Sequence, residues 1–306
     1  MPPIVPAGEV VFGIQLPVQA QSKYFVEPWE LSAGPKEVAS VAQAADRAGF
    51  FYVAVCDHVV IPDDLAPRMS AVWWDTIATL GWLAGLTDRT HLLSSVFNLS
   101  YRHPLVSANS FATLDYISNG RAIIGVGAGH VEKEFAALDV DFAKRGPLTD
   151  EALRVLDRVL TEGAIDGMQL EPRPVQKPRP PIWVGGSAPA AVRRAARLAD
   201  GWLPQGTPLE QMPDMVSVYR AERDSAGHQG TGDVGAISEW LYVGDPSWDL
   251  NRPCVSGKPA QLADALNQWA AVGVNHLQVR FPSRGVEELV DQVTAFGQEV
   301  GPLLGG

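Results

Sequence analysis

Short apolar runs alternate along the chain with longer segments of helical periodicity. Eight of the runs are rich in β-branched or aromatic residues and end at glycine, proline or polar residues, which is typical of buried strands. These predicted strands cover residues 10–16, 51–55, 92–96, 121–126, 181–184, 201–203, 234–243 and 276–279. Each strand is followed by a predicted helix, and the helices cover residues 35–49, 73–86, 104–117, 149–160, 190–198, 209–226, 261–272 and 286–300.

This regular alternation predicts the fold class. Strands that alternate with helices form parallel sheets, and continuous apolar strands are buried on both faces. Eight such units favour a closed barrel over an open doubly wound sheet, so we predict an α/β protein with a (β/α)8 TIM barrel and insertions in its βα loops. The proline-rich stretch at residues 171–181 is interpreted as a connection within the barrel, so a single domain is expected over residues 1–306.

Composition narrows the functional classes. Of the 306 residues, 46% are hydrophobic and 19% are charged, which is typical of a globular protein with a large core. The formal net charge of -11 argues against nucleic-acid binding, because an acidic surface repels phosphate backbones. There is no basic signal-peptide segment, and no apolar run reaches the roughly 18 residues needed to span a bilayer. We expect a soluble cytoplasmic protein that acts on a small molecule and binds no membrane.

In a TIM barrel, reacting groups lie where strands end and βα loops begin. The second predicted strand ends in Asp57 and His58, and a histidine there can exchange a proton near neutral pH. A histidine that is hydrogen-bonded for structure alone explains the residue equally well. Asp57 could orient the imidazole only after a bend, because neighbouring strand residues point to opposite faces.

Two glycine-rich turns follow later strands. Residues 125–129 read Gly-Val-Gly-Ala-Gly but lack the spacing of a dinucleotide-binding loop, so either a close approach to a flat group or tight barrel packing explains them. Gly185, Gly186 and Ser187 precede a helix start at residues 189–190. They form either an anion site suited to a phosphate or a plain helix cap.

The remaining candidate groups give weaker signals. The six histidines and two cysteines show no metal-ligand spacing, so no metal site and no disulfide framework is predicted. Trp29, Trp240 and Trp248 fall in or beside long loops and could line an apolar pocket.

Several of these segments together resemble one known family. They are VCDHVVIP at residues 55–62, SSVFNLSYRHP at 94–104 and, most specifically, ATLDYISNGR at 112–121, which continues through GVGAG to Glu134, Phe135 and Arg145–Gly146. Residues 180–204 and 273–282 extend the resemblance over nearly the whole chain. The chain resembles the luciferase-like monooxygenase superfamily, in its branch of coenzyme F420-dependent oxidoreductases.

The resemblance implies an oxidoreductase that exchanges a hydride between C5 of the deazaflavin F420 and a small organic substrate. His58 is the implied catalytic acid or base, with His130 as its rival. The motif match assigns the coenzyme contacts to Asp57, Ser95, Val96, Gly127, Ala128, Gly129, Gly185, Gly186 and Ser187. It also implies a non-prolyl cis peptide at Ser95–Val96. A homodimer is expected through the helices of the lower-numbered βα units, where Trp73, Trp74 and Trp82 supply apolar surface.

Three alternatives remain at this point. An FMN-dependent luciferase-like monooxygenase is the first, because flavin and deazaflavin rings have the same shape. A flavin- or deazaflavin-binding protein without catalysis is the second. A metal-dependent hydrolase on the same barrel is the third, and the missing ligand spacing argues against it. His130 stands where the sugar-phosphate dehydrogenases of the family carry an acidic residue, which argues against a sugar-phosphate substrate.

Overall fold

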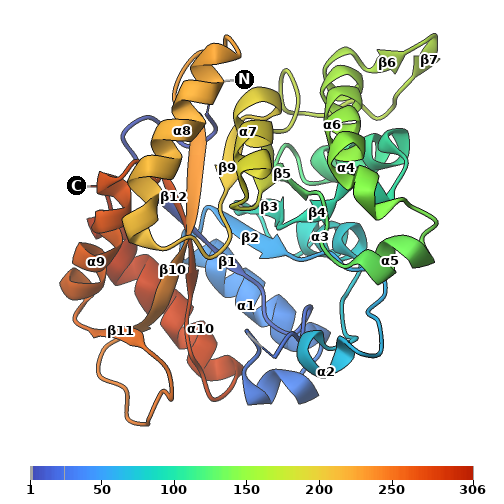
Figure 1. Cartoon of the computed structure of the whole chain (residues 1–306). Coiled ribbons are helices and arrows are strands. Elements are labelled where there is room, and N and C mark those ends of the chain that lie inside the picture. Colours follow the sequence, from blue (N-terminus) through green and yellow to red (C-terminus); the bar gives the residue numbers. More distant parts are fainter. Residues whose placement is uncertain (1–2, 24, 306) are drawn as a thin grey trace.

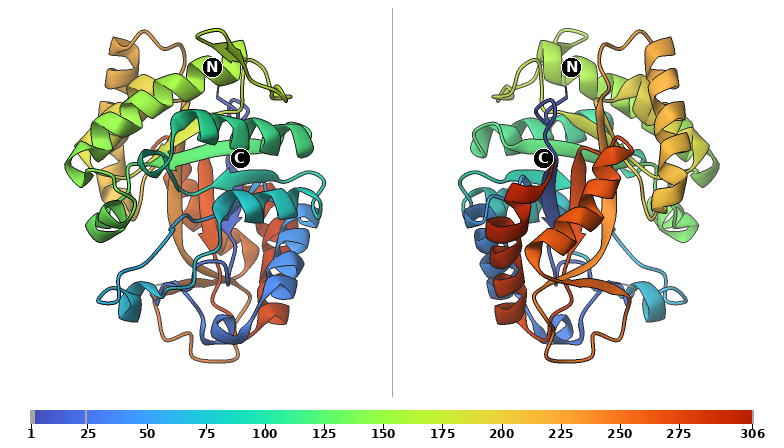
Figure 2. Two further views of the ribbon diagram at one scale, coloured as in Figure 1. Left: turned by 90° about the vertical axis from the view of Figure 1, so that its right-hand side faces the viewer. Right: turned by 90° about the vertical axis from the view of Figure 1, so that its left-hand side faces the viewer.

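Eight parallel strands close into a barrel that helices surround (Figures 1 and 2). The computed structural model describes residues 3–23 and 25–305. In their order around the barrel, the strands are β1 (Val11–Gln15), β2 (Tyr52–Val55), β3 (His91–Ser94), β5 (Ala122–Gly127), β8 (Ile182–Gly185), β9 (Gly201–Leu203), β10 (Asp233–Val243) and β12 (His276–Arg280). Pairing of β10 with β9 and of β1 with β12 closes the ring, so the predicted TIM barrel is confirmed.

A helix follows each barrel strand, and all eight predicted helices are present. They are α1 (Pro35–Arg47), α3 (Thr76–Ala84), α4 (Pro104–Ile117), α6 (Arg145–Glu162), α7 (Pro189–Leu198), α8 (Met212–Ser225), α9 (Pro259–Ala271) and α10 (Val286–Ala295). Proline in the first turn starts several of them, because its fixed φ suits a helix and its missing N–H is not needed there. Within residues 3–23 and 25–305, every helix is too short or too polar to cross a membrane.

Shorter elements lie in the connections. The helices α2 (Ala66–Met69) and α5 (Glu132–Ala137) follow β2 and β5, and were not predicted because so few residues show no clear period. An antiparallel hairpin of β6 (Ala164–Ile165) and β7 (Met168–Gln169) precedes the proline-rich stretch, which joins α6 to β8 as expected. The strand β11 (Cys254–Gly257) pairs with the outer part of β10.

The third predicted strand is divided in two. It runs as β3 to Ser94 and continues after Val96 as β4 (Phe97–Asn98), which pairs with β5. The peptide bond between the two parts, Ser95–Val96, is cis, so the prediction drawn from the family resemblance is confirmed.

Side chains fill the amino-terminal part of the barrel. The indole of Trp183 stacks on the imidazole of His276 with ring centroids 4.1 Å apart, and its N–H donates to Asp233 at 3.0 Å. Tyr52 packs edge-on against both rings. Asp233 and His276 begin their strands, so this plug fills the amino-terminal end. Space for a ligand is left at the opposite end, where the long connections after β1, β2 and β10 gather at the bottom of Figures 1 and 2.

Candidate functional site

A cavity of about 530 Å³ opens at the carboxyl ends of the barrel strands. This volume lies within the range of small-molecule and cofactor sites. Polar and charged side chains from strand ends and the loops after them border it, namely Gln15, Cys56, Asp57, His58, Ser95, Asn98, His130, Gln205, Gln278 and Arg280. Apolar walls come from Ile14, Leu16, Val96, Ile237 and Trp240, and the short helix α2 borders the mouth with Arg68 and Met69.

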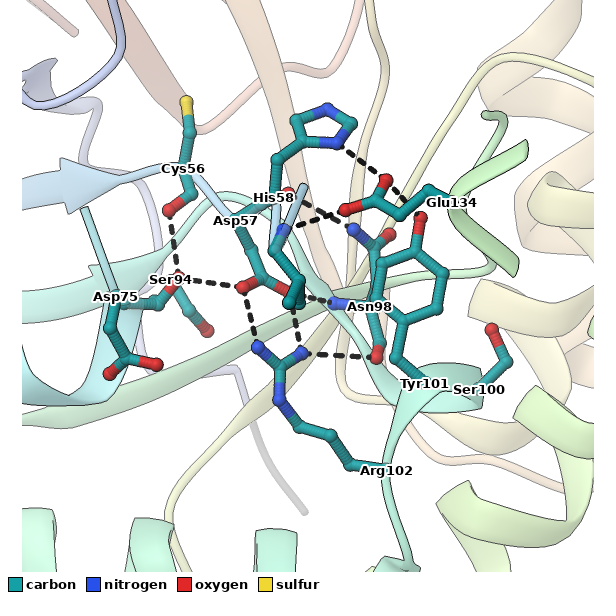
Figure 3. Close-up of polar contacts among 12 residues, drawn as sticks. Cys56, Asp57, His58, Asp75, Ser94, Asn98, Ser100, Tyr101, Arg102 and Glu134 are labelled. Carbon is teal, nitrogen blue, oxygen red and sulfur yellow. Dashed lines mark hydrogen bonds and ion pairs between the residues drawn. The ribbon is translucent and has the colours of Figure 1, made fainter. Parts of the chain in front are cut away.

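His58 lies just beyond β2, with only 8% of its surface exposed. Its ring meets Trp73 and His130 edge-on, at centroid distances of 4.5 and 5.5 Å. The Nδ1 atom lies 2.8 Å from Oε2 of Glu134 (Figure 3). A carboxylate only accepts hydrogen bonds, so Nδ1 is the donor and Nε2 is left as the nitrogen that can give or take a proton. Nε2 has no hydrogen bond to any residue in the described ranges.

Glu134, on α5, is the residue that orients His58. The side chain is completely buried, and its Oε2 also accepts from the Tyr101 hydroxyl at 2.7 Å. Its Oε1 accepts from the backbone N–H groups of Val59 and Val60 at 2.6 and 3.3 Å. Burial raises the pKa of Glu134, but the hydrogen bonds from His58, Tyr101 and Val59 outweigh burial and lower that pKa below its ordinary value. The carboxylate is therefore ionised at neutral pH.

No local sequence pattern indicates this role of Glu134. Glu134 is 76 positions from His58, and it lies on a helix of only six residues. The one sequence signal for Glu134 is that it lies in the segment that resembles the family, which continues from residues 125–129 through Glu134 and Phe135. Only the barrel, which brings β2 beside β3 and β3 beside β5, places the loop after β2 near α5.

Asp57 does not orient His58. Its two carboxylate oxygens accept from Nη1 and Nη2 of Arg102 at 2.7 and 2.8 Å, in a bidentate pair (Figure 3). The backbone N–H of Asn98 donates to it at 2.8 Å, and the Thr76 hydroxyl donates at 3.2 Å. Asp57 therefore ties the end of β2 to β4 and α3. It borders the cavity with both oxygens engaged, and its contact with a coenzyme stays a prediction.

The glycines of β5 and β8 make room for Val96. A Cβ added at Gly127 would lie 2.6 Å from Val96 Cγ2, and one at Gly185 would lie 2.5 Å from Val96 Cγ1. A Cβ at Gly125 would collide with the Ser94 carbonyl oxygen. Tight barrel packing thus explains these glycines. Ser95 and Val96 border the cavity, whereas residues 127–129 do not, and their predicted coenzyme contacts remain untested.

The turn after β8 packs against the loop after β9. The hydroxyl groups of Ser187 and Thr207 lie 2.6 Å apart, and the Gln205 N–H donates to Ser187 Oγ at 2.9 Å. Gly186 has φ 112°, a backbone conformation that favours glycine. Gln205 reaches the cavity, so this turn adjoins it, and a phosphate held by Gly185, Gly186 and Ser187 stays a prediction.

Other groups near the cavity have narrower roles. Of the three tryptophans proposed for a pocket, only Trp240 is among the residues that border the cavity. Trp29 donates to Ser283, which does border it, and Trp248 donates to Glu288. Burial raises the pKa of the Cys56 thiol to about 12, so Cys56 is no nucleophile at neutral pH. No metal-binding cluster of three or more His, Cys, Asp or Glu residues occurs in the part of the chain that the structure describes.

Comparison with known proteins places this barrel in a family. The model of the luciferase-like monooxygenase family matches residues 11–246. The chain belongs to this family. An uncharacterized protein of Mycobacterium tuberculosis is 28% identical over 220 residues, which cover 65% of this luciferase-like chain and 75% of the relative.

Solved structures of other proteins share the fold. The monooxygenase RslO1 from Streptomyces bottropensis aligns with a TM-score of 0.77 and 22% identity, over 95% of this chain and 99% of its own. The coenzyme F420-dependent tetrahydromethanopterin reductase from Methanopyrus kandleri aligns with a TM-score of 0.74 and 20% identity, over 96% and 99%. At these identities the likeness concerns the luciferase-like fold alone.

Proposed function

We propose that this protein is an oxidoreductase that binds coenzyme F420 and exchanges a hydride with a small organic substrate. The observation that carries the proposal is His58, whose Nδ1 is held by the buried, ionised Glu134 and whose Nε2 is free of any described partner at the cavity. The F420 dependence of the Methanopyrus reductase, which has the same fold, supports the choice of coenzyme.

The cavity suits a flat aromatic coenzyme. Val96 borders it and is fixed between Gly127 and Gly185, which cannot carry a Cβ without moving it. Ile14, Leu16 and Ile237 add further apolar wall. An apolar wall with a few convergent polar groups is typical of cofactor sites. The residues assigned to the ring are Asp57, Ser95 and Val96, with residues 127–129 behind them and Gly185, Gly186 and Ser187 for the phosphate tail.

His58 provides the proton chemistry that such a reaction needs. When bound, a deazaflavin supplies or accepts the hydride. A substrate carbonyl that receives a hydride leaves an alkoxide that needs a proton, and the reverse reaction needs a base. His58 Nε2 serves both directions, because the Glu134 carboxylate accepts the hydrogen bond from Nδ1 and leaves Nε2 as the nitrogen that takes up or gives the proton.

His130 is the second candidate. Partial desolvation at the cavity mouth and the neighbouring His58 lower the pKa of His130, so it is neutral at pH 7. It has no carboxylate partner comparable to Glu134 among the described residues. His58 is therefore the acid or base of this proposal, and His130 an accessory residue at the mouth.

The experiment has a binding arm and a turnover arm. Pure protein is titrated with F420 and with FMN, followed by absorbance, and the tighter binder is used to screen carbonyl and alcohol compounds. We expect tighter binding of F420. Tighter FMN binding with oxygen consumption supports instead a monooxygenase, the activity of RslO1. Failure of both coenzymes to bind contradicts the proposal.

Histidine variants then test the assignment. We expect His58→Ala to lose roughly 10²- to 10⁴-fold in turnover, the usual size of a general acid–base contribution, while coenzyme binding persists. His228→Ala, which removes an imidazole that does not border the cavity, is the matched control. Normal turnover of His58→Ala combined with loss in His130→Ala would mean that His130 is the catalytic histidine.

A further inference from the structure

Arg280, the last residue of β12, brings a cation into the mouth of the barrel. Residues along a strand point alternately to its two faces. His276 faces the interior, where it stacks on Trp183, and Leu277 and Val279 belong to the core between strands and helices. Gln278 and Arg280 therefore face inward, and both border the cavity.

The guanidinium of Arg280 is only partly used. Its Nε donates to the Ser238 carbonyl oxygen at 3.0 Å, and its Cζ lies 5.0 Å from the centroid of the Trp240 ring. Within residues 3–23 and 25–305, Nη1 and Nη2 form neither a hydrogen bond nor an ion pair. Burial lowers the pKa of Arg280, yet an arginine keeps its charge at neutral pH. A half-buried cation with two free donor atoms thus borders the cavity.

Neighbouring acids are engaged elsewhere. Glu27 forms an ion pair with Arg252 at 2.8 Å. The guanidinium of Arg252 also lies over the Trp240 ring. Glu30 accepts from the backbone N–H groups of Val18 and Glu27 at 2.7 and 2.9 Å. Glu239 attracts Arg280 electrostatically, but its carboxylate accepts from the Trp269 indole at 3.2 Å.

Asp57 is the remaining acid that borders the cavity, and it is held by Arg102. Among the described residues, no carboxylate forms an ion pair with Arg280. Its charge is therefore open to an anion that enters from the cavity.

We propose that Arg280 binds the carboxylate of an organic-acid substrate, at the same site as the hydride transfer proposed above and resting on that function. Two free guanidinium N–H groups match the two oxygens of a carboxylate. The strand β12 pairs with β1, and β1 pairs with β2, which leads to His58. Arg280 and His58 therefore border the same arc of the cavity mouth.

The turn assigned to the coenzyme phosphate lies elsewhere on the ring. It follows β8, which is three strands from β2 in one direction and three strands from β12 in the other. This separation assigns the anion at Arg280 to the substrate and not to the coenzyme tail.

Benzoate and benzamide are suitable probes, because they have nearly the same shape and differ in charge. Calorimetric titration of the whole protein measures both affinities, without and with bound coenzyme. We expect wild type to prefer benzoate by about 10- to 100-fold, the value of a charge-assisted contact. Arg280→Met should abolish this preference, and Arg280→Lys should restore part of it. Arg154→Met removes a cation from the exposed surface of α6 and should leave the preference unchanged.

Each outcome is decisive. The proposal is overturned by equal affinities of wild type for benzoate and benzamide, or by an unchanged preference in Arg280→Met with a normal melting temperature. Arg280→Met is also titrated with F420 and FMN. If Arg280→Met loses affinity for the coenzyme but keeps the preference for benzoate, the coenzyme is the anion that Arg280 binds. This result also overturns the proposal. If wild type binds neither coenzyme but keeps the Arg280-dependent preference, the proposed function fails while the anion site stands.

Discussion

His276 offers a sharp test of the barrel's interior packing. The residue is completely buried at the amino end of β12, and its ring stacks nearly parallel to Trp183, with an interplanar angle of 12°. Neither ring nitrogen has a hydrogen-bond partner within the described ranges. Because burial disfavours the charged imidazolium, it lowers the pKa of His276 from 6.5 to about 3.

The shifted pKa makes folding stability depend on pH. Below about pH 6.5 the unfolded chain binds a proton at this histidine and the folded chain does not, so acid favours unfolding. The contribution of His276 is fully present above pH 6.5 and decreases as the pH falls toward 3. One pKa unit corresponds to about 1.4 kcal/mol, and pH 5 lies about 1.5 units below the unfolded value. The free energy of unfolding should therefore fall by about 2 kcal/mol between pH 7.5 and pH 5 from this residue alone.

The substitution His276→Phe removes the titration and keeps an aromatic ring against Trp183. Space is tight, because a Cβ on Gly235 would touch the His276 ring. The larger phenyl ring therefore lowers stability at every pH, by about 1–3 kcal/mol. The informative quantity is therefore the change in the free energy of unfolding between pH 7.5 and pH 5, and not its value at either pH. Other titrating groups, such as the partly buried His91, are common to both proteins and cancel in this comparison.

Urea unfolding followed by tryptophan fluorescence at pH 7.5 and pH 5 measures this difference. We expect wild type to lose about 2 kcal/mol more than His276→Phe between the two conditions. His228→Gln, at a partly exposed position, should behave as wild type. Equal pH-dependent losses in wild type and His276→Phe would refute the reasoning, because the buried imidazole would then be protonated in the folded protein as readily as in the unfolded chain.

Three further predictions concern the site, the barrel wall and the assembly. Glu134→Gln should present a donor to His58 Nδ1 and move the proton of the neutral ring to Nε2, which ¹⁵N chemical shifts of labelled histidine report. Gly185→Ala should force a Cβ against Val96 and lower the free energy of unfolding by about 1–3 kcal/mol in urea titrations. Trp82, which is 36% exposed on α3, should lie in a homodimer interface, so Trp82→Glu should shift the sedimentation coefficient of a dimer to that of a monomer.

Matched variants make these outcomes interpretable. Glu132→Gln changes an exposed carboxylate on the same helix and should leave the His58 tautomer unchanged; an unchanged tautomer in Glu134→Gln contradicts the orienting role. Gly81→Ala places its Cβ in ordinary contact, 3.9 Å from Ile117, and should stabilise α3 by up to about 1 kcal/mol. A Gly185→Ala variant as stable as wild type contradicts the packing argument. A monomeric wild-type protein at micromolar concentration contradicts the dimer.

Local sequence patterns determined the order and type of the barrel elements. In apolar runs such as residues 52–55 and amphipathic segments such as residues 35–47, the pattern of buried positions is visible within a few neighbouring residues. Each strand and helix can therefore be predicted without knowledge of the rest of the fold. Helices of four and six residues, α2 and α5, were missed because they are too short for a period to appear. The cis peptide at Ser95–Val96 came from the family resemblance, since no local pattern predicts it.

Only the tertiary structure decided which groups meet at the carboxyl ends of the strands. Asp57 and His58 are neighbours in the sequence, but in the closed barrel Asp57 forms an ion pair with Arg102. His58 is hydrogen-bonded instead to Glu134, which is 76 positions away. It also leaves the Arg280 guanidinium without a carboxylate partner in the described part of the chain, at the edge of the same cavity. The physical reason is that strand and helix formation depends on local burial, whereas hydrogen-bond partners depend on how strands distant in sequence are ordered around the ring. The chain thus determines its barrel locally and its chemistry through contacts between distant segments.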